Sequence, residues 1–238
     1  MSNSYFQFKQ FKVEQDRCAM KVTTDACIQG AWTPIPATAR RALDIGAGTG
    51  LLSLMLAQRA PQLNIDAVEL DEQAAQQAGE NVANADISER ISVIAGDIQN
   101  VALQEGLYDL IISNPPFFNN SLLGDVRVKN RARHTLTLGY DGLAAATRKC
   151  LATEGAMSIL LPPPEYDLWL MAAGKEGLYP FHELRVRHRP NGKMTRVIGL
   201  MSHSVVAEIR KEELIINGED GQYSPAFRSL LAPFYLHL

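Results

Sequence analysis

The chain has 238 residues, 46% of them hydrophobic, and a formal net charge of −3 at pH 7. This length suits one α/β domain with a buried core, and the charge gives no overall attraction to nucleic acid, so a polyanion site would need local clusters. No apolar run reaches the roughly 18 residues of a membrane span, and Met1–Arg17 has no secretory signal. Three cysteines without a Cys-x-x-Cys pair indicate reduced thiols, so we expect a cytoplasmic protein with no membrane partner.

The first 20 residues mix aromatic side chains with lysine and glutamine in a partly alternating pattern. That pattern is typical of an edge strand or of an arm that orders on binding. Thr23, Thr24 and Asp25 then provide N-cap candidates for a short apolar helix that ends by Pro34.

Strands and helices alternate over the rest of the chain. The strands are expected at Arg41–Ile45, Ile65–Leu70, Ile91–Ala95, Tyr108–Ser113, Met157–Leu161, Glu183–Arg189 and Thr195–His203. The helices are expected at Leu51–Arg59, Asp71–Ala85, about Asp141–Leu151 and about Glu165–Ala173. This alternation predicts a Rossmann-like, doubly wound α/β fold with a mostly parallel sheet of seven strands and helices on both faces. The last two strands form a hairpin that adds an antiparallel edge. No domain boundary appears, so we expect one domain over residues 1–238.

The stretch from Tyr108 to Phe117 joins a buried strand to a stiff polar turn. Pro115 and Pro116 end the strand because neither has an N–H for a neighbouring strand, and Asn114 is biased to extended backbone because it precedes a proline. An amide and an aromatic ring are thus held at the carboxyl end of a strand, where ligands bind in open α/β sheets.

This turn suits methylation of an amino nitrogen whose lone pair is delocalised. The side-chain oxygen of Asn114 and the carbonyl of Pro115 can accept its two N–H bonds, hold it in line with an electrophile and favour the charge that it acquires. Phe117 can stack on a flat substrate. The alternative is that a proline pair after a strand is only a turn.

The glycine-rich loop from Gly46 to Gly50 lies between an expected strand and an expected helix, where glycines let the backbone approach a ligand. A dinucleotide fingerprint would need a glycine at Leu51. The pattern is instead Asp-x-Gly-x-Gly-x-Gly from Asp44, similar to the S-adenosylmethionine loop of Rossmann-like methyltransferases.

Two acids follow at the ends of the next strands. Glu69 can accept both hydroxyl protons of a ribose, or is an ordinary charge at a strand end. Asp97 can accept from an adenine amino group, or caps a helix. Their order, each at a carboxyl end, favours the methyltransferase interpretation.

With these motifs placed, the chain resembles the class I methyltransferases of the amino-group subset. Guanine-N2 rRNA enzymes of that subset typically carry His where Phe118 stands, and the protein glutamine-N5 enzymes usually carry Tyr where Phe117 stands. From Phe6 through Met20 to the end, the sequence is most similar to the bacterial tRNA adenine-N6 methyltransferases, which act beside the anticodon of a valine tRNA. The resemblance implies a seven-stranded sheet with a reversed last strand.

The resemblance also implies a set of site residues. The cofactor-binding residues would be Thr23, Thr24, Asp44, Gly46, Gly48, Gly50, Glu69, Leu70, Asp97 and Ile98, and the catalytic residues Asn114, Pro115 and Phe117. S-adenosylmethionine would be the cofactor and tRNA the partner. No histidine spacing suggests a metal site.

Two sets of basic residues are candidates for phosphate contacts. Arg127, Lys129, Arg131 and Arg133 follow the Asn-Pro-Pro-Phe turn, and Arg185, Arg187 and Arg189 alternate along a late strand. A solvated loop and a charged edge strand are the alternatives. The sequence also leaves open an rRNA or protein glutamine methyltransferase, a nicotinamide dehydrogenase, and an RNA-binding module with a vestigial pocket.

Overall fold

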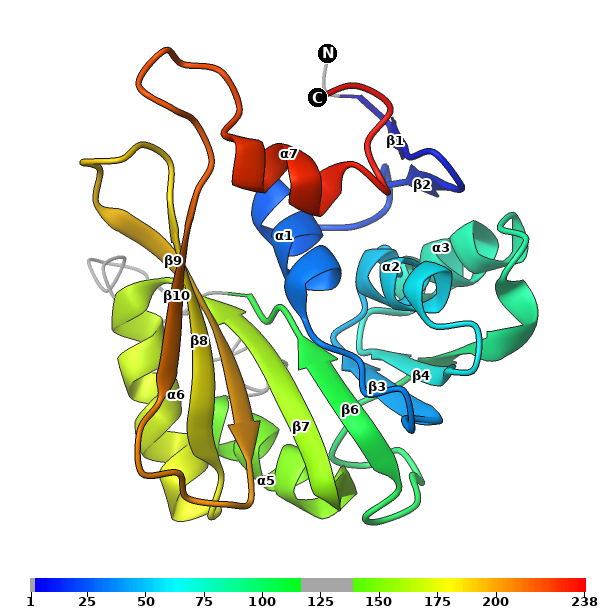
Figure 1. The fold of residues 1–238 in the computed structure, drawn as a ribbon. Helices are drawn as coiled ribbons and strands as arrows, with labels where there is room; N and C mark the ends of the chain where they lie inside the picture. The colour runs from blue at the N-terminus through cyan, green and yellow to red at the C-terminus, as the bar shows by residue number, and fades with distance from the viewer. Residues whose placement is uncertain (1–2, 117–138) are drawn as a thin grey trace, which may run out of the picture.

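An eight-stranded sheet forms the centre of the protein in the computed structural model, which describes residues 3–116 and 139–238 (Figure 1). Its strands are β3 (Arg41–Ile45), β4 (Asn64–Glu69), β5 (Ile91–Ala95), β6 (Tyr108–Ser113), β7 (Leu151–Leu161), β8 (Tyr179–Arg187), β9 (Met194–Ser202) and β10 (Arg210–Ile215). The order across the sheet is β10-β8-β9-β7-β6-β3-β4-β5.

The sheet is parallel except for β9, which runs antiparallel between β7 and β8. The predicted Rossmann-like sheet with one reversed strand is therefore confirmed. Two details were wrong. The reversed strand lies inside the sheet, because the β8–β9 hairpin folds back and puts β9 next to β7. The count is eight, because β10 adds an outer strand beside β8.

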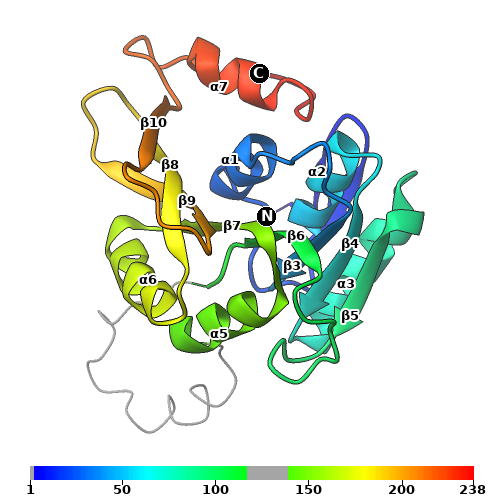
Figure 2. The ribbon, with the colours of Figure 1, turned by 60° about the horizontal axis from the view of Figure 1, so that its bottom comes forward.

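Helices cover both faces of the sheet (Figure 2). They are α1 (Thr24–Trp32), α2 (Leu51–Arg59), α3 (Glu72–Ala83), η1 (Ser88–Arg90), α5 (Tyr140–Cys150), α6 (Pro163–Lys175) and α7 (Pro225–Leu231). One apolar cluster joins α1, α2 and α7 to one face, and a second joins α5 and α6 to the other. Alternate residues of β6 divide between them, since Leu110 and Ile112 face the first cluster and Ile111 the second.

Side chains cap the starts of two helices. The Thr23 hydroxyl accepts a hydrogen bond from the N–H of Ala26 at 3.2 Å, and the Asp71 carboxylate accepts one from the N–H of Ala74 at 2.9 Å. Each satisfies a backbone donor that has no partner inside its helix. These caps place α1 and α3 directly after the segments that approach the carboxyl edge of the sheet.

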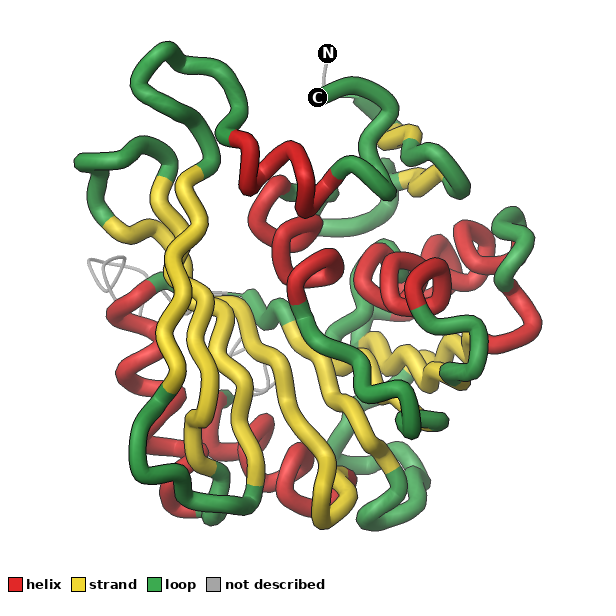
Figure 3. Tube along the Cα trace, viewed as in Figure 1, coloured by secondary structure: helices red, strands yellow, loops and turns green. Residues whose placement is uncertain are grey.

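The N-terminal residues form a sheet of their own, β1 (Tyr5–Gln7) with β2 (Lys12–Glu14), apart from the main sheet (Figure 3). They are not an edge strand of the large sheet. Phe8 is fully buried and bridges to Tyr235 near the C-terminus. The segment is thus packed on the chain's own C-terminal part. In the described ranges, no helix has the length and apolar character needed to cross a membrane.

Candidate active site

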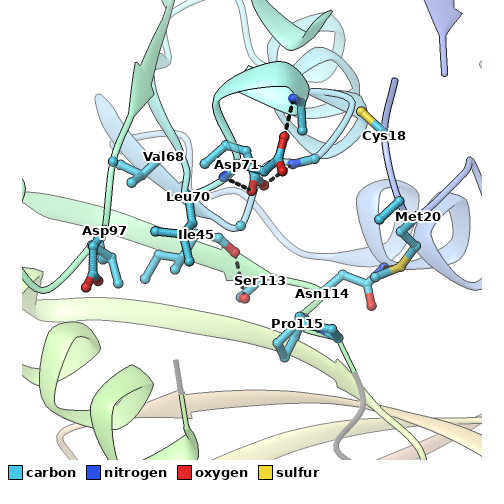
Figure 4. Close-up of a pocket in the computed structure, with 18 of the residues that line it drawn as sticks. Cys18, Met20, Ile45, Val68, Leu70, Asp71, Asp97, Ser113, Asn114 and Pro115 are labelled. Atoms are coloured by element: carbon cyan, nitrogen blue, oxygen red, sulfur yellow. Dashed lines mark hydrogen bonds between the residues drawn. The ribbon is translucent and has the colours of Figure 1, made fainter. Parts of the chain in front are cut away.

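A cavity of about 510 Å³ opens at the carboxyl ends of four neighbouring parallel strands, β3 to β6. Ile45 ends β3, Glu69 ends β4 and Asn114 follows β6, and all three line it. Asp97, just after β5, lines it as well, and the segment of residues 16–20 before α1 forms another wall (Figure 4). This is the edge of an α/β sheet at which ligands bind.

The loop between β3 and α2 presents backbone to the cavity. Gly46 and Gly48 have φ angles of 75° and 55°, which other residues rarely adopt. No described atom lies within 4 Å of a Cβ built at either position, so the glycines are required by conformation and leave open space beside the chain. The N–H of Gly46 is bonded to the carbonyl of Val68 at 2.9 Å, which holds the loop against β4.

The carboxylate of Glu69 is fixed by two backbone donors. Its Oε2 accepts from the N–H of Gly48 at 2.8 Å, and its Oε1 accepts from the N–H of Asp71 at 2.9 Å. Each carboxylate oxygen has lone-pair capacity left. The group can therefore accept two further O–H donors from the cavity without turning.

Asp97, Ile98 and Leu70 also line the cavity. The Asp97 carboxylate accepts from the N–H of Gln99 at 3.0 Å and from the Asn100 amide at 3.1 Å, so it stabilises a turn and also faces the cavity. Ile98 is buried, while Leu70 is 43% exposed. Two apolar side chains next to a hydrogen-bond acceptor suit a flat base with an amino group.

Asp44 does not line the cavity. It is fully buried, and its Oδ2 accepts from the N–H and the hydroxyl of Ser53 in α2, at 3.2 and 2.7 Å. Burial raises the pKa of Asp44 to about 7, even though both bonds from Ser53 favour the charged form. The expected contact of Asp44 with the cofactor is thus corrected: the Asp44 side chain joins β3 to α2, the two elements that flank the glycine loop.

Three further predicted contacts also lie outside the cavity lining. Gly50 has a φ angle of 79° and forms the N-cap of α2. Thr23 is occupied as the N-cap of α1, and Thr24 is the first residue of that helix. The segment that carries the two threonines does reach the cavity, but through residues closer to the N-terminus.

The turn after β6 presents one amide with a defined orientation (Figure 4). The Nδ2 of Asn114 donates to the sulfur of Met20 at 3.8 Å, and the Oδ1 of Asn114 is buried without a partner among the described residues. A buried acceptor without a donor costs about 1–3 kcal/mol. The amide oxygen is therefore ready to accept an N–H from a ligand.

The backbone before Asn114 is held from α1. Gln29 is fully buried, and its amide donates to the carbonyl of Ser113 at 3.0 Å and to the carbonyl of Ser158 in β7 at 3.3 Å. The Ser113 hydroxyl donates to the carbonyl of Ile45 at 2.8 Å. Three elements thus fix the turn that carries Asn114 and Pro115, both of which line the cavity.

The wall formed by residues 16–20 was missed by motif reasoning. It is held by two buried amides of α3: Gln77 accepts from the N–H of Arg17 at 3.1 Å, and Asn81 accepts from the N–H of Glu14 at 2.8 Å. Asn81 also donates to the carbonyl of Thr49 at 2.9 Å, so one side chain ties the end of β2, just before this wall, to the glycine loop. The only sequence signal was the resemblance that includes Met20.

Two groups of predicted site residues cannot be placed. Phe117 and the basic residues Arg127, Lys129, Arg131 and Arg133 lie outside the described residues. The three cysteines are unpaired and buried, as expected. Burial raises the pKa of the Cys18 thiol, in the cavity wall, to about 11. Among the described side chains, no group of three His, Cys, Asp or Glu residues is arranged to hold a metal ion.

A mostly parallel sheet with one reversed strand and a cavity at its carboxyl edge defines the class of Rossmann-like methyltransferases. A solved structure with this fold, a predicted O-methyltransferase from Agrobacterium tumefaciens, is 18% identical with a TM-score of 0.71, covering 88% of this chain and 96% of that one. The chain belongs to the methyltransferase small domain family, whose model matches residues 31–160.

Curated relatives are similar over the full length. One, from Dyadobacter fermentans, is 43% identical over 98% of both chains, and another, from Serratia proteamaculans, is 42% identical over 97% of this chain and 89% of the relative. Both carry the name tRNA1(Val) (adenine(37)-N6)-methyltransferase. The similarity therefore extends beyond the family model to β8, β9, β10 and α7.

Proposed function

We propose that this protein transfers the methyl group of S-adenosylmethionine to the exocyclic N6 of an adenosine in tRNA. The names of full-length relatives support the acceptor, an adenosine of the anticodon loop of a valine tRNA. The observation that carries the chemistry is the buried Oδ1 of Asn114, which has no partner among the described residues and belongs to a residue that lines the cavity.

The residues of the cavity fit the cofactor. The carboxylate of Glu69, already fixed by two backbone N–H groups, would accept from both ribose hydroxyls. Asp97, Ile98 and Leu70 would hold the adenine, and the open backbone at Gly46 and Gly48 would lie against the methionine part. A cavity of about 510 Å³ is within the usual range for a small-molecule site. When bound, S-adenosylmethionine supplies an electrophilic methyl group on a sulfonium.

The role of Asn114 is to orient the acceptor. An exocyclic amino nitrogen has its lone pair delocalised into the ring, and it has two N–H bonds to donate. Asn114 Oδ1 would accept one and the carbonyl of Pro115 the other, which holds the nitrogen in line for direct transfer and favours the positive charge that develops on it. As the nitrogen takes the methyl group the sulfonium would leave as a neutral thioether, and the nitrogen then loses one proton to solvent. Asn114 does not act as a general base, and no covalent enzyme intermediate is needed.

Met20 fixes the direction of the Asn114 amide. With Nδ2 bonded to the Met20 sulfur, the oxygen and not the NH₂ group faces the acceptor. If the amide were flipped, its NH₂ group would face the N–H of the acceptor, and two donors cannot hydrogen-bond to each other. Met20 is therefore proposed as a positioning residue, acting through Asn114.

The target base must leave any stack before it reaches the turn. A base in a duplex is inaccessible, whereas an anticodon loop offers one that is already single-stranded. Stacking of this base on Phe117, and phosphate contacts from Arg127, Lys129, Arg131 and Arg133, remain predictions from the sequence.

The direct test is to incubate the protein with methyl-labelled S-adenosylmethionine and bulk unmodified tRNA, and to digest the product to nucleosides. We expect label in N6-methyladenosine, with the Asn114→Ala variant as the control. Label in another nucleoside, or none in tRNA, would refute the proposed acceptor. Incubation with rRNA and with protein substrates would then test the two alternative acceptors.

A further inference from the structure

The arginine row on β8 is not a row of free charges. Arg185 forms an ion pair with the buried carboxylate of Glu183 at 3.0 Å. Arg187 forms one with Glu213 of β10 at 2.5 Å and also donates to the carbonyl of Gly192 at 2.6 Å. Both guanidinium groups are therefore used inside the protein. Arg185 is paired within β8, whereas Arg187 connects β8 to β10 and to the turn that follows.

The turn between β8 and β9, residues 188–193, differs from β8 in how its basic side chains are paired. We call it the hairpin tip. Arg189 and Lys193 are exposed, and neither has an ion-pair partner in the described part of the chain. The sequence has no Asp or Glu from 184 to 207, so the positive charge at the hairpin tip is not balanced by neighbours along the chain.

The hairpin tip lies at the same edge of the sheet as Asn114. β8 is antiparallel to β9, β9 is antiparallel to β7, and β7 is parallel to β6, so β8 and β6 both end at this edge. Figure 1 shows the hairpin projecting there, beside the end of β10. Three strand spacings of about 4.8 Å separate β6 from β8. Nucleotides adjoining a base held at Asn114 can span that distance.

The hairpin tip is also preformed. The N–H of Gly192 donates to the carbonyl of Arg189 at 2.9 Å, the Arg187 guanidinium holds the Gly192 carbonyl, and Pro190 restricts the backbone. A preformed turn loses little conformational freedom when its charges bind a ligand. Arg187 thus braces the turn, while the side chains of Arg189 and Lys193 are exposed to solvent.

One neighbouring loop carries charge of the opposite sign. Residues 217–223 adjoin the hairpin tip, since the N–H of Asn217 donates to the carbonyl of His188 at 3.0 Å. Glu219 and Asp220 are exposed on that loop. A polyanion would be repelled on this side, which confines its contact to the cations of the hairpin tip itself.

We propose that the hairpin tip binds the phosphate backbone of the RNA acceptor through Arg189 and Lys193, while Arg187 braces it and Arg185 stays paired with Glu183. This inference rests on the proposed function, because it takes RNA as the acceptor. Phosphate contacts of this kind position the substrate and carry no sequence information.

The test compares two double variants with the same change in net charge. Arg189→Glu/Lys193→Glu reverses the hairpin tip. Arg148→Glu/Lys211→Glu reverses two exposed residues at the opposite edge, where α5 leads into β7 and where β10 begins. Circular dichroism and S-adenosylmethionine affinity check that each variant is folded. The measured quantities are tRNA affinity as a function of salt, and kcat and KM for tRNA.

For the hairpin-tip variant we expect tRNA affinity to fall about tenfold or more, with the slope of log K against log salt reduced by about 0.7–0.9 per lost contact. KM should rise, while kcat at saturating tRNA stays unchanged. Glu219→Gln should strengthen binding. Equal affinity and salt slope in the two double variants would overturn the inference, whereas a wild-type protein that methylates no tRNA would refute the proposed function, and the inference with it.

Discussion

Replacing Asp44 with asparagine should change how the stability of the protein depends on pH. Burial raises the pKa of Asp44 from 3.8 to about 7. Below the lower value, the carboxyl is protonated in both the folded and the unfolded chain. Between the two values the unfolded chain releases the proton and the folded protein keeps it, so the free energy of unfolding falls as pH rises. Above the upper pKa the carboxyl is ionised in both states, so this contribution to the free energy of unfolding falls no further.

The size of the effect follows from the two pKa values. They differ by about 3.2, and each pKa unit corresponds to about 1.36 kcal/mol, so the destabilisation at high pH is on the order of 4 kcal/mol. Asparagine keeps an oxygen for the two donors of Ser53 and carries no charge. The variant should therefore gain stability relative to wild type as pH rises.

Chemical unfolding of both proteins between about pH 4 and about pH 9 measures this difference, and other titrating groups cancel because the two chains share them. Ser53→Ala is the matched variant, because it removes the hydroxyl donor and keeps the backbone donor. The pKa of Asp44 should then rise further, so the fall in the free energy of unfolding should extend to higher pH. A stability difference between wild type and Asp44→Asn that is flat with pH, or that falls, would refute the assignment of a buried, proton-retaining carboxyl.

Three further substitutions test the site and the core. Asn114→Ala should lower kcat by about 10²–10³, the effect of losing one preorganised hydrogen-bonding group at the reacting atom, and leave S-adenosylmethionine affinity unchanged; turnover near that of wild type would remove Asn114 from the mechanism. Met20→Leu keeps the volume but removes the sulfur acceptor, so kcat should fall about three- to tenfold at constant KM for tRNA; a change in KM alone would indicate a role in packing. Gly199→Ala should lower the free energy of unfolding by about 1–3 kcal/mol, because a Cβ there would overlap the buried ring of Tyr166; an unchanged unfolding midpoint would contradict that packing.

The central strands could be predicted from the sequence because burial on both faces leaves a clear signal. The run Arg41–Ile45 is followed by glycine, and the run Tyr108–Ser113 is followed by Asn114 and two prolines. Their boundaries match those of β3 and β6. β10 was missed for the opposite reason. Its first four residues are all charged, as suits an outer strand, and only Leu214 is buried.

Site residues next to motifs were predicted more reliably than residues that reach the site from elsewhere. Glu69 and Asp97 line the cavity because Glu69 ends β4 and Asp97 comes just after β5. Met20 and Asn114 are in contact although they are 94 positions apart in the sequence, and no local pattern encodes that contact. Asp44 stands in the same motif as Gly46, but its side chain points to Ser53, and the direction of a side chain at a strand end depends on packing.

The orphaned oxygen of Asn114 also bears on which acceptors the site prefers. Among the described residues Asn114 Oδ1 has no partner, and Pro115, the next residue of the turn, adds a backbone carbonyl, so we expect the turn to offer two acceptors and to need two donors. A primary amino group supplies both N–H bonds at one atom, whereas a hydroxyl supplies one proton and leaves the second acceptor buried and unpaired. That unmet acceptor costs about 1–3 kcal/mol, or roughly ten- to a hundredfold in rate. We expect the preference for nitrogen to arise from the turn after β6 and from the Met20 contact that directs its amide.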